Sequence, residues 1–206
     1  AARLILQLRR QGITDDAVLS ALETVDRGAF VDSAYAHLAN DDCSVPIPCG
    51  QLVPRPLVTA QLLSALGLSP AKEERVLLIG SGSGYTAGLL SHSARHVYGV
   101  ERYKGLVDAS KQRLAELKIE NVSIRHGDGL EGLSEHGPFD RVLLTGSVTT
   151  LPRTLIEQVA ANGYLLAPIN ENGGQVLRCL SHDLKVVDTA ISAPLTPLRE
   201  GVAALF

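Results

Sequence analysis

Three glycines alternate with serines at the end of a predicted strand. The stretch VLLIGSGSGYTAGLL (76–90) places Gly80, Gly82 and Gly84 where an apolar strand gives way to a helix. Glycine lets the main chain turn tightly and approach a ligand without a side chain in the way. Glu101 follows 21 residues after Gly80, at the end of the next predicted strand, where an acid can accept hydrogen bonds from ribose hydroxyls. The pattern predicts a site for a cofactor that contains a nucleoside.

The glycine spacing favours S-adenosylmethionine over a dinucleotide. A dinucleotide motif reads G-x-G-x-x-G and places a pyrophosphate at a helix N-terminus. Here the third glycine comes one residue early, bulky Tyr85 follows it, and no phosphate-binding lysine is present. Asp128, in the stretch GDG (127–129), adds an acid after the third predicted strand, where an adenine amino group can be held. The competing interpretation is that the glycines only form tight turns between strands and helices.

Strands alternate with helices in the second part of the chain. Five apolar segments have the character of strands: 75–80, 96–101, 122–128, 139–146 and 163–169. Helical patterns at 103–118 and 151–162 lie between them, and the segment 174–192 looks like two strands joined by a turn around His182–Asp183. Alternation implies parallel pairing, whereas two strands so close in sequence must be antiparallel. We predict a Rossmann-like, doubly wound α/β fold whose mainly parallel seven-stranded sheet ends in an antiparallel C-terminal hairpin.

The first third of the chain is predicted to be a helical cap. Thr14 is the expected N-cap of a helix whose first turn carries two acids. The stretch PIPCGQLVPRP (46–56) is rich in proline, which forbids a helix, and shows no strand pattern. We therefore predict one domain over 1–206, with the cap and a substrate loop in 1–70 and the cofactor-binding core in 71–206.

Composition narrows the class of protein. The net charge is −3 and no run of Lys or Arg exceeds two residues, which argues against a nucleic-acid partner. No apolar stretch reaches the roughly 18 residues of a membrane span, and the N-terminal stretch does not fit a signal peptide. The three cysteines form no C-x-x-C pair and the six histidines are dispersed. We expect a cytoplasmic monomer with no metal site and no membrane partner.

The motifs follow one another in the order of a known family. The stretches LIGSGSGYTAGLL, HVYGVE, NVSIRHGDG, GPFDRVLLTGS and LIEQVAANGYLLAPI resemble the protein L-isoaspartyl methyltransferase family. The glycine motif of that family typically reads V-L-E-I-G-T-G-S-G-Y, and its fourth strand reads F-D-x-I-I-V-T-A. The stretch GITDDAVLSALETVDRGAFVD (12–32) is similar to the N-terminal segment of the family. The resemblance covers nearly the whole chain and weakens after about Asn170.

The resemblance implies an activity and a set of site residues. It implies that S-adenosyl-L-methionine is used to methylate the α-carboxyl of isoaspartyl residues in damaged proteins or peptides. That carboxyl, with a pKa of about 3.5, is already anionic at neutral pH, so no general base is required. In the resemblance Glu101 holds the ribose, Asp128 lies by the adenine and Thr145 lies beside the methyl donor. The full set implied to bind the cofactor is Gly80, Ser81, Gly82, Ser83, Gly84, Glu101, Asp128, Gly129 and Thr145.

The substrate loop departs from the family motif P-I-G-H-G-Q-T-I-S-Q-P. Leu52 stands where the family has Thr, and Pro54 where it has Ser, so the two hydroxyls that face the reacting centre are missing. We expect Gln51, Pro54 and Arg55 at the catalytic centre, on a loop that forms an apolar wall. Arg55 either grips the substrate carboxylate in place of the hydroxyls or faces solvent.

A second departure is Leu78, where the family carries an acid that helps hold the ammonium end of the cofactor. Losing such a charge-assisted hydrogen bond would weaken cofactor binding by about ten- to hundredfold. The two departures leave two alternatives open. One is a relic that binds cofactor or peptide without turnover, and the other is a methyltransferase for a different small-molecule carboxyl or hydroxyl.

Overall fold

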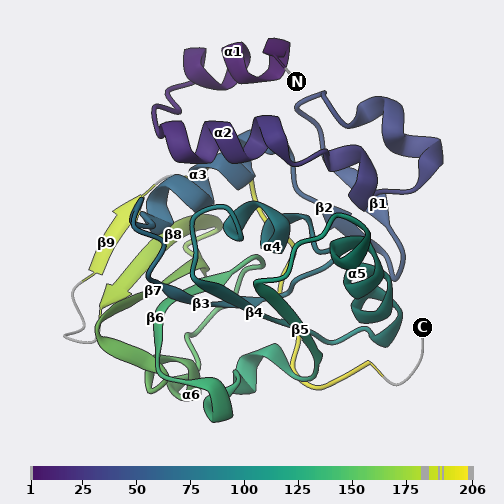
Figure 1. Ribbon diagram of the computed structural model, residues 1–206. Coiled ribbons are helices and arrows are strands. Elements are labelled where there is room, and N and C mark those ends of the chain that lie inside the picture. The colour runs from purple at the N-terminus through teal and green to yellow at the C-terminus, as the bar shows by residue number, and fades with distance from the viewer. Residues whose placement is uncertain (1, 182–185, 190, 192, 204–206) are drawn as a thin grey trace.

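The computed structural model describes residues 2–181, 186–189, 191 and 193–203, and a seven-stranded sheet runs through its centre (Figure 1). The strand order is β5-β4-β3-β6-β7-β8-β9, and the first five strands are parallel to one another. Strands β8 and β9 then follow β7 with antiparallel pairing. The predicted fold class, a mainly parallel sheet closed by an antiparallel C-terminal hairpin, is confirmed.

Strand β3 (Arg75–Ile79) lies in the middle of the parallel part, between β4 (His96–Glu101) and β6 (Phe139–Leu144), and β5 (Val122–His126) forms the edge. The last four residues of β3 are buried, as expected for a strand covered on both faces. Parallel strands end at the same edge of the sheet, so the segments after β3, β4, β5 and β6 meet there. This edge carries the candidate site.

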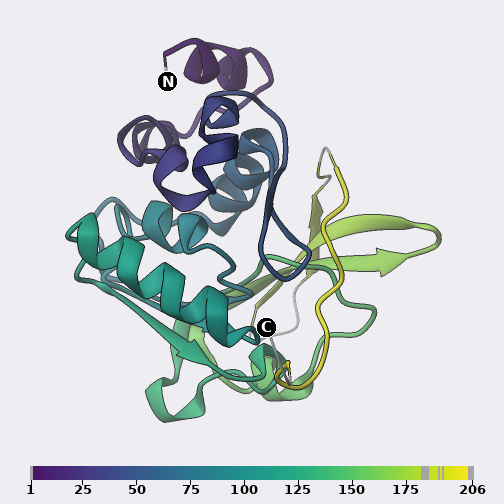
Figure 2. The same ribbon diagram turned by 90° about the vertical axis from the view of Figure 1, so that its right-hand side faces the viewer.

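Helices cover both faces of the sheet in two layers (Figure 2). One layer contains α3 (Pro56–Leu66), α4 (Tyr85–Leu90) and α5 (Lys104–Glu116), and the N-terminal helices lie outside it. The other layer is thinner and contains η3 (Gly129–Glu131), η4 (Ser134–His136) and α6 (Arg153–Ile156). Side chains alternate along β3, so that Leu78 enters the core on the first side and Leu77 the core on the second.

The segment after α6 differs from the prediction. The helix expected over 151–162 is only Arg153–Ile156, and β7 (Val159–Glu171) begins before the expected strand. Val159 pairs with Phe139 of β6, so the sheet takes up residues that have a helical pattern in isolation. A turn at Asn172 and Gly173, with φ angles of 48° and 81°, leads into β8 (Gly174–Ser181). Strand β9 (Val186–Thr189) completes the predicted hairpin, whose turn at His182–Asp183 lies outside the described residues.

The N-terminal part is a helical cap, as predicted, with one shifted boundary. It comprises α1 (Ala2–Arg10), α2 (Asp16–Thr24), η1 (Arg27–Phe30) and η2 (Ser33–Leu38). Asp15, not Thr14, is the N-cap of α2, because its carboxylate accepts hydrogen bonds from the N–H groups of Ala17 and Val18. Among the described residues no helix is long and apolar enough to cross a bilayer.

The substrate loop contains a β-hairpin, and the expectation of a loop without strands was wrong. Strand β1 (Val45–Ile47) pairs antiparallel with β2 (Gln51–Val53), an arrangement called here the substrate hairpin. Cys49 and Gly50 in the turn adopt left-handed φ angles of 64° and 65°, a conformation that reverses the chain tightly. Proline is tolerated because a two-stranded ribbon leaves one side of each strand unpaired.

Candidate active site

A cavity of about 370 Å³ opens at the carboxyl edge of the parallel strands. Segments far apart in sequence form its walls: the glycine turn after β3, the ends of β4 and β6, the start of η3, the substrate hairpin, and an extended segment, 193–199, near the C-terminus. Figure 2 shows the hairpin loop and this C-terminal segment on the same side of the molecule. Because the walls come from separate elements, the cavity exists only in the folded chain.

The glycine turn is shaped by left-handed backbone and by close packing. Gly80, Gly82 and Gly84 have φ angles of 81°, 53° and 91°, which side-chain-bearing residues rarely adopt. A Cβ atom at Gly80 would lie 2.7 Å from Oγ1 of Thr145, so no side chain fits there. The Thr145 hydroxyl lies 2.9 Å from the carbonyl oxygen of Ile79, to which it donates, and so ties β6 to the turn. Bare backbone therefore faces the cavity.

Glu101 ends β4 beside this turn and is only 6% exposed. One carboxylate oxygen, Oε2, accepts a hydrogen bond from the N–H of Gly82 at 2.9 Å. The other, Oε1, accepts from the N–H of Tyr103 at 3.1 Å. A carboxylate offers about four acceptor positions, so each oxygen retains one that a ligand can use. The backbone thus fixes the carboxylate at the cavity wall with capacity to accept further hydrogen bonds.

Two serines separate the glycines, and they have different surroundings. The Ser83 hydroxyl accepts a hydrogen bond from the N–H of Tyr85 at 3.4 Å and belongs to the start of α4. The Ser81 hydroxyl is buried against Gly99 of β4 and has no hydrogen-bond partner among the residues that the structure describes. Its side chain therefore belongs to the packing between the turn and β4. The glycine cradle and Glu101 are the features that fit a polar nucleoside-type ligand at this wall.

The remaining predicted cofactor residues divide into two groups. Gly129 lines the cavity, and Ile79 packs so closely against it that a Cβ atom would lie 2.6 Å from a methyl carbon. Asp128 accepts hydrogen bonds from the N–H groups of Leu130 at 2.9 Å and Gly201 at 2.5 Å, and it is not among the lining residues. Gly84 also lies behind the wall, where it begins α4. The predicted role of these two residues in binding the cofactor stays a prediction.

The C-terminal strap, residues 193–203, was missed by sequence reasoning. It crosses the carboxyl edge beside β6, with the N–H of Ser147 donating to Thr196 and the N–H of Leu198 donating to Ser147, at 3.0 and 2.8 Å. Leu198 packs over Gly80 and Gly146, where any side chain would collide with it or with its neighbours. The one signal was the apolar, proline-containing stretch APLTPL (193–198), which has no helical or strand period. Its place over the glycine turn depends on contacts between distant segments.

The three residues expected at the catalytic centre all lie on the hairpin side of the cavity. Pro54 presents its ring there, and its carbonyl oxygen accepts from the buried Arg27 guanidinium at 3.1 Å. The side-chain amide of Gln51 donates to the carbonyl of Cys49 at 3.1 Å, within the hairpin turn. The Arg55 guanidinium donates to the carboxylate of Asp42, through Nε at 3.1 Å and through a short bond from Nη2. Arg55 is therefore held in an ion pair with Asp42 that uses two of its five N–H donors, and it is not simply solvated.

The sequence profile of the protein-L-isoaspartate(D-aspartate) O-methyltransferase family matches residues 1–194. This chain belongs to that family. Proteins named protein-L-isoaspartate O-methyltransferase are similar to it over almost their entire length. The one from Pectobacterium atrosepticum is 39% identical over 203 residues, covering 98% of this chain and 96% of that protein. The one from Yersinia enterocolitica is 41% identical over 204 residues, with the same coverage of both chains.

A solved structure of the same family has the same fold. A protein-L-isoaspartate O-methyltransferase from Plasmodium falciparum, crystallised with S-adenosyl-L-homocysteine, superposes with a TM-score of 0.82 at 28% identity. The match covers 96% of this chain and 97% of that chain. The resemblance drawn from the motifs is confirmed, and so is the doubly wound methyltransferase architecture.

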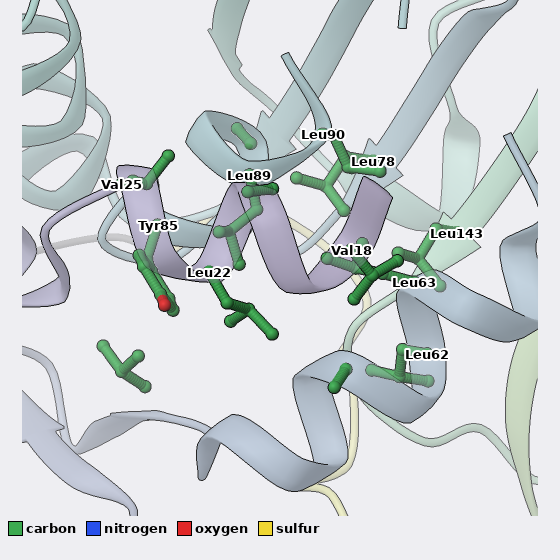
Figure 3. Packing of buried hydrophobic residues seen from close by; sticks show 14 of the residues in the cluster. Val18, Leu22, Val25, Leu62, Leu63, Leu78, Tyr85, Leu89, Leu90 and Leu143 are labelled. Atoms are coloured by element: carbon green, nitrogen blue, oxygen red, sulfur yellow. The ribbon is translucent and has the colours of Figure 1, made fainter. Parts of the chain in front are cut away.

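Leu78 does not occupy the position that the family motif suggested for a cofactor ligand. Its side chain is fully buried in the core between the sheet and the helical layer, near Leu90 and Leu143 (Figure 3). It is not among the residues that line the cavity. Where the family motif has an acid, this chain has a leucine that packs in the core. The position of Leu78 therefore does not support the expected ten- to hundredfold loss of cofactor affinity.

Asp42 organises the base of the substrate hairpin, and its replacement has a measurable consequence. Its side chain is 3% exposed and binds both Arg55 and the N–H of Leu57, in the first turn of α3. Burial alone would raise the Asp42 pKa, but the hydrogen bonds from Arg55 and Leu57 outweigh it and lower that pKa. Asp42→Asn is expected to lower the free energy of unfolding by about 1–3 kcal/mol at neutral pH.

The pH dependence of that loss follows from the direction of the shift. A carboxyl whose pKa is lower in the folded state stabilises the protein above its unfolded pKa of about 3.9, and the contribution disappears as the pH falls through the folded pKa. Urea unfolding at a series of pH values should therefore show the wild type and Asp42→Asn converging below about pH 4. A difference that stays constant over this range would show that the ion pair does not stabilise the hairpin.

Proposed function

We propose that this chain transfers the methyl group of S-adenosyl-L-methionine to the α-carboxyl of isoaspartyl residues in damaged proteins or peptides. The observation that carries the proposal is the buried Glu101 carboxylate, held by two backbone N–H groups beside a side-chain-free turn at the cavity wall. Family membership supplies the reaction, and the geometry supplies a place for the ribose and the methionine portion of the cofactor. The bound cofactor contributes an activated methyl group on a sulfonium.

The residues of this chain bind, orient and exclude water. Glu101 would accept hydrogen bonds from the ribose hydroxyls, because each of its oxygens retains an acceptor position. Thr145 holds the glycine turn in the shape that lets backbone approach the cofactor. The hairpin and the strap, which border the cavity, would position the substrate carboxylate beside the bound cofactor and limit the access of water. Attack by an anion on a cation gives neutral products, so a poorly hydrated cavity favours the step.

The proposal extends to partners and location. The substrates are isoaspartyl-containing proteins and peptides, which the narrow cavity admits by one side chain and its flanking backbone. The net charge of −3 and the absence of a basic run support a protein that acts without nucleic acid or a membrane surface. We place it in the cytoplasm as a monomer. Size-exclusion chromatography with light scattering checks the oligomeric state.

The relic alternative loses its main support. It depended on Leu78 as a missing cofactor ligand and on Pro54 as a missing hydroxyl. Leu78 is a core residue, and the cofactor wall retains its glycines and its acid. A methyltransferase for another small molecule finds no support among the similar proteins, which are named protein-L-isoaspartate O-methyltransferase.

The test is a methylation assay with matched peptides. The wild-type protein is incubated with S-adenosyl-L-methionine and either an isoaspartyl peptide or the same peptide with ordinary aspartate. We expect a base-labile methyl ester on the isoaspartyl peptide and none on the control. Binding of S-adenosyl-L-homocysteine in a calorimeter without any ester would favour the relic. Ester formation on the aspartyl peptide would contradict the assigned substrate class.

A further inference from the structure

Two residues on the cavity-facing side of the substrate hairpin offer no hydrogen-bond donor to an anionic substrate. Leu52 and Pro54 both line the cavity, and neither side chain can donate a hydrogen bond. A carboxylate moved from water into such a site is strongly disfavoured unless hydrogen-bond donors replace its hydration. Arg55 is held by Asp42 through two of its N–H donors. A hydroxyl on the same face would supply a donor beside the two residues that have none.

The strand register brings one hydroxyl to that face. In the hairpin Val45 pairs with Val53, and Pro46 pairs with Leu52. Extending the antiparallel register by one residue sets Ser44 opposite Pro54. Directly opposed residues project to the same side, with Cβ atoms about 4.5–5.5 Å apart. The alternation of burial agrees: Val45 and Val53 are buried, whereas Ser44 is exposed. Ser44 lines the cavity together with Leu52, Val53 and Pro54.

The buried side chain of Arg27 holds the segments of Ser44 and Pro54 together. Nη2 of Arg27 donates to the carbonyl of Cys43 at 2.7 Å and to the carbonyl of Pro54 at 3.1 Å. One nitrogen thus clamps the residue before Ser44 to the residue opposite it. Arg27 is 3% exposed, and burial lowers its pKa without removing its charge in the neutral range. The Asp42–Arg55 ion pair closes the next rung of the hairpin base.

We propose that the Ser44 hydroxyl binds the substrate carboxylate, in place of the hydroxyl that Pro54 cannot supply. This inference rests on the proposed function and names the substrate-binding residue of the same site. Ser44 Oγ–H would donate to one carboxylate oxygen and leave the other to form the O–CH₃ bond, while the bond from the methyl group to the sulfonium sulfur breaks with its electron pair left on S-adenosyl-L-homocysteine. No proton is transferred, because the carboxylate arrives as an anion. Within the described residues no hydrogen bond engages the Ser44 hydroxyl, so it is available for this role.

The experiment moves the hydroxyl across the hairpin. Steady-state methylation of an isoaspartyl peptide is measured for the wild type, Ser44→Ala, Ser44→Thr and the double variant Ser44→Ala/Pro54→Ser. Ser44→Ala is expected to lower kcat/KM by about 10- to 100-fold, mostly through KM, because a hydrogen bond to a charged group is lost. Ser44→Thr keeps a hydroxyl and should stay within about fivefold of the wild type, and the double variant should recover most of the loss.

Controls separate this role from folding and from cofactor binding. Ser33→Ala removes an exposed hydroxyl on η2 that does not line the cavity, and it should leave kcat/KM unchanged. Affinity for S-adenosyl-L-homocysteine and the thermal midpoint should be the same in all variants. Calorimetric binding of the isoaspartyl peptide to protein saturated with S-adenosyl-L-homocysteine tests Ser44 without turnover. A wild type that binds peptide but makes no ester would refute the proposed function, not the Ser44 role.

Two results would overturn the inference. One is a Ser44→Ala variant whose peptide affinity and kcat/KM lie within twofold of the wild type. The other is a double variant that performs no better than Ser44→Ala, because a serine at position 54 would then fail to replace the one opposite it. Recovery by Pro54→Ser would show that a hydroxyl on this face of the hairpin is sufficient, whichever of the two strands carries it.

Discussion

Replacing Glu101 with glutamine is expected to weaken the binding of S-adenosyl-L-homocysteine by at least about 100-fold, because two charge-assisted hydrogen bonds to the ribose are lost or weakened. Two backbone N–H groups beside the carboxylate make the effect of this substitution larger. Both carboxylate oxygens accept from N–H groups, those of Gly82 and Tyr103. Whichever way the glutamine amide turns, its NH₂ group faces one of these donors. The substitution therefore also disturbs the glycine turn that it borders.

Isothermal titration calorimetry at neutral pH measures this effect directly. Glu116→Gln, on the exposed end of α5, removes the same charge away from the cavity and serves as the matched control. Its affinity should equal that of the wild type, and both variants should keep the wild-type circular dichroism spectrum. An affinity of Glu101→Gln within threefold of the wild type would remove Glu101 from the cofactor site, and with it the main support for the proposed function.

Introducing the family's acid at Leu78 is expected to destabilise the protein by about 3–5 kcal/mol instead of tightening cofactor binding. Leu78 is 0% exposed and lies in the core between the sheet and the helices (Figure 3). A glutamate there has neither water nor a cation to replace its hydration, so its pKa rises and the cavity-facing wall gains nothing. In a chain of this length, each kcal/mol lowers the thermal midpoint by about 2–4 °C.

Thermal and urea unfolding of Leu78→Glu test this expectation, with Leu78→Met as the volume-conserving control, for which a loss below about 1.5 kcal/mol is expected. The deficit of Leu78→Glu should shrink at acid pH, because the folded state then takes up a neutral carboxyl that the unfolded state also carries. A variant with unchanged stability and stronger binding of S-adenosyl-L-homocysteine would restore the idea that this position contacts the cofactor.

Much of the cofactor wall could be predicted from local sequence. The alternation of glycines after an apolar strand required a side-chain-free turn, and the spacing to Glu101 required a parallel neighbour that ends at the same edge. Both follow from the geometry of a strand–turn–helix unit, in which residues close in sequence are also close in space. Asp128 and Gly84 belong to the predicted segments but are not among the residues that line the cavity. Their contact with the cofactor stays a prediction.

The sequence by itself determined the class of fold, the family and the presence of a glycine turn with an acid beside it, because periodicity and spacing act over short stretches of chain. Only the tertiary structure decided that Leu78 packs in the core, that Arg55 pairs with Asp42, and that the strap crosses the glycine turn. It also paired Val45 with Val53, from which we infer that Ser44 lies opposite Pro54. These contacts join segments that are far apart in the sequence, and no periodic pattern of residues predicts them. They form only when the hydrophobic core and the strand register form together.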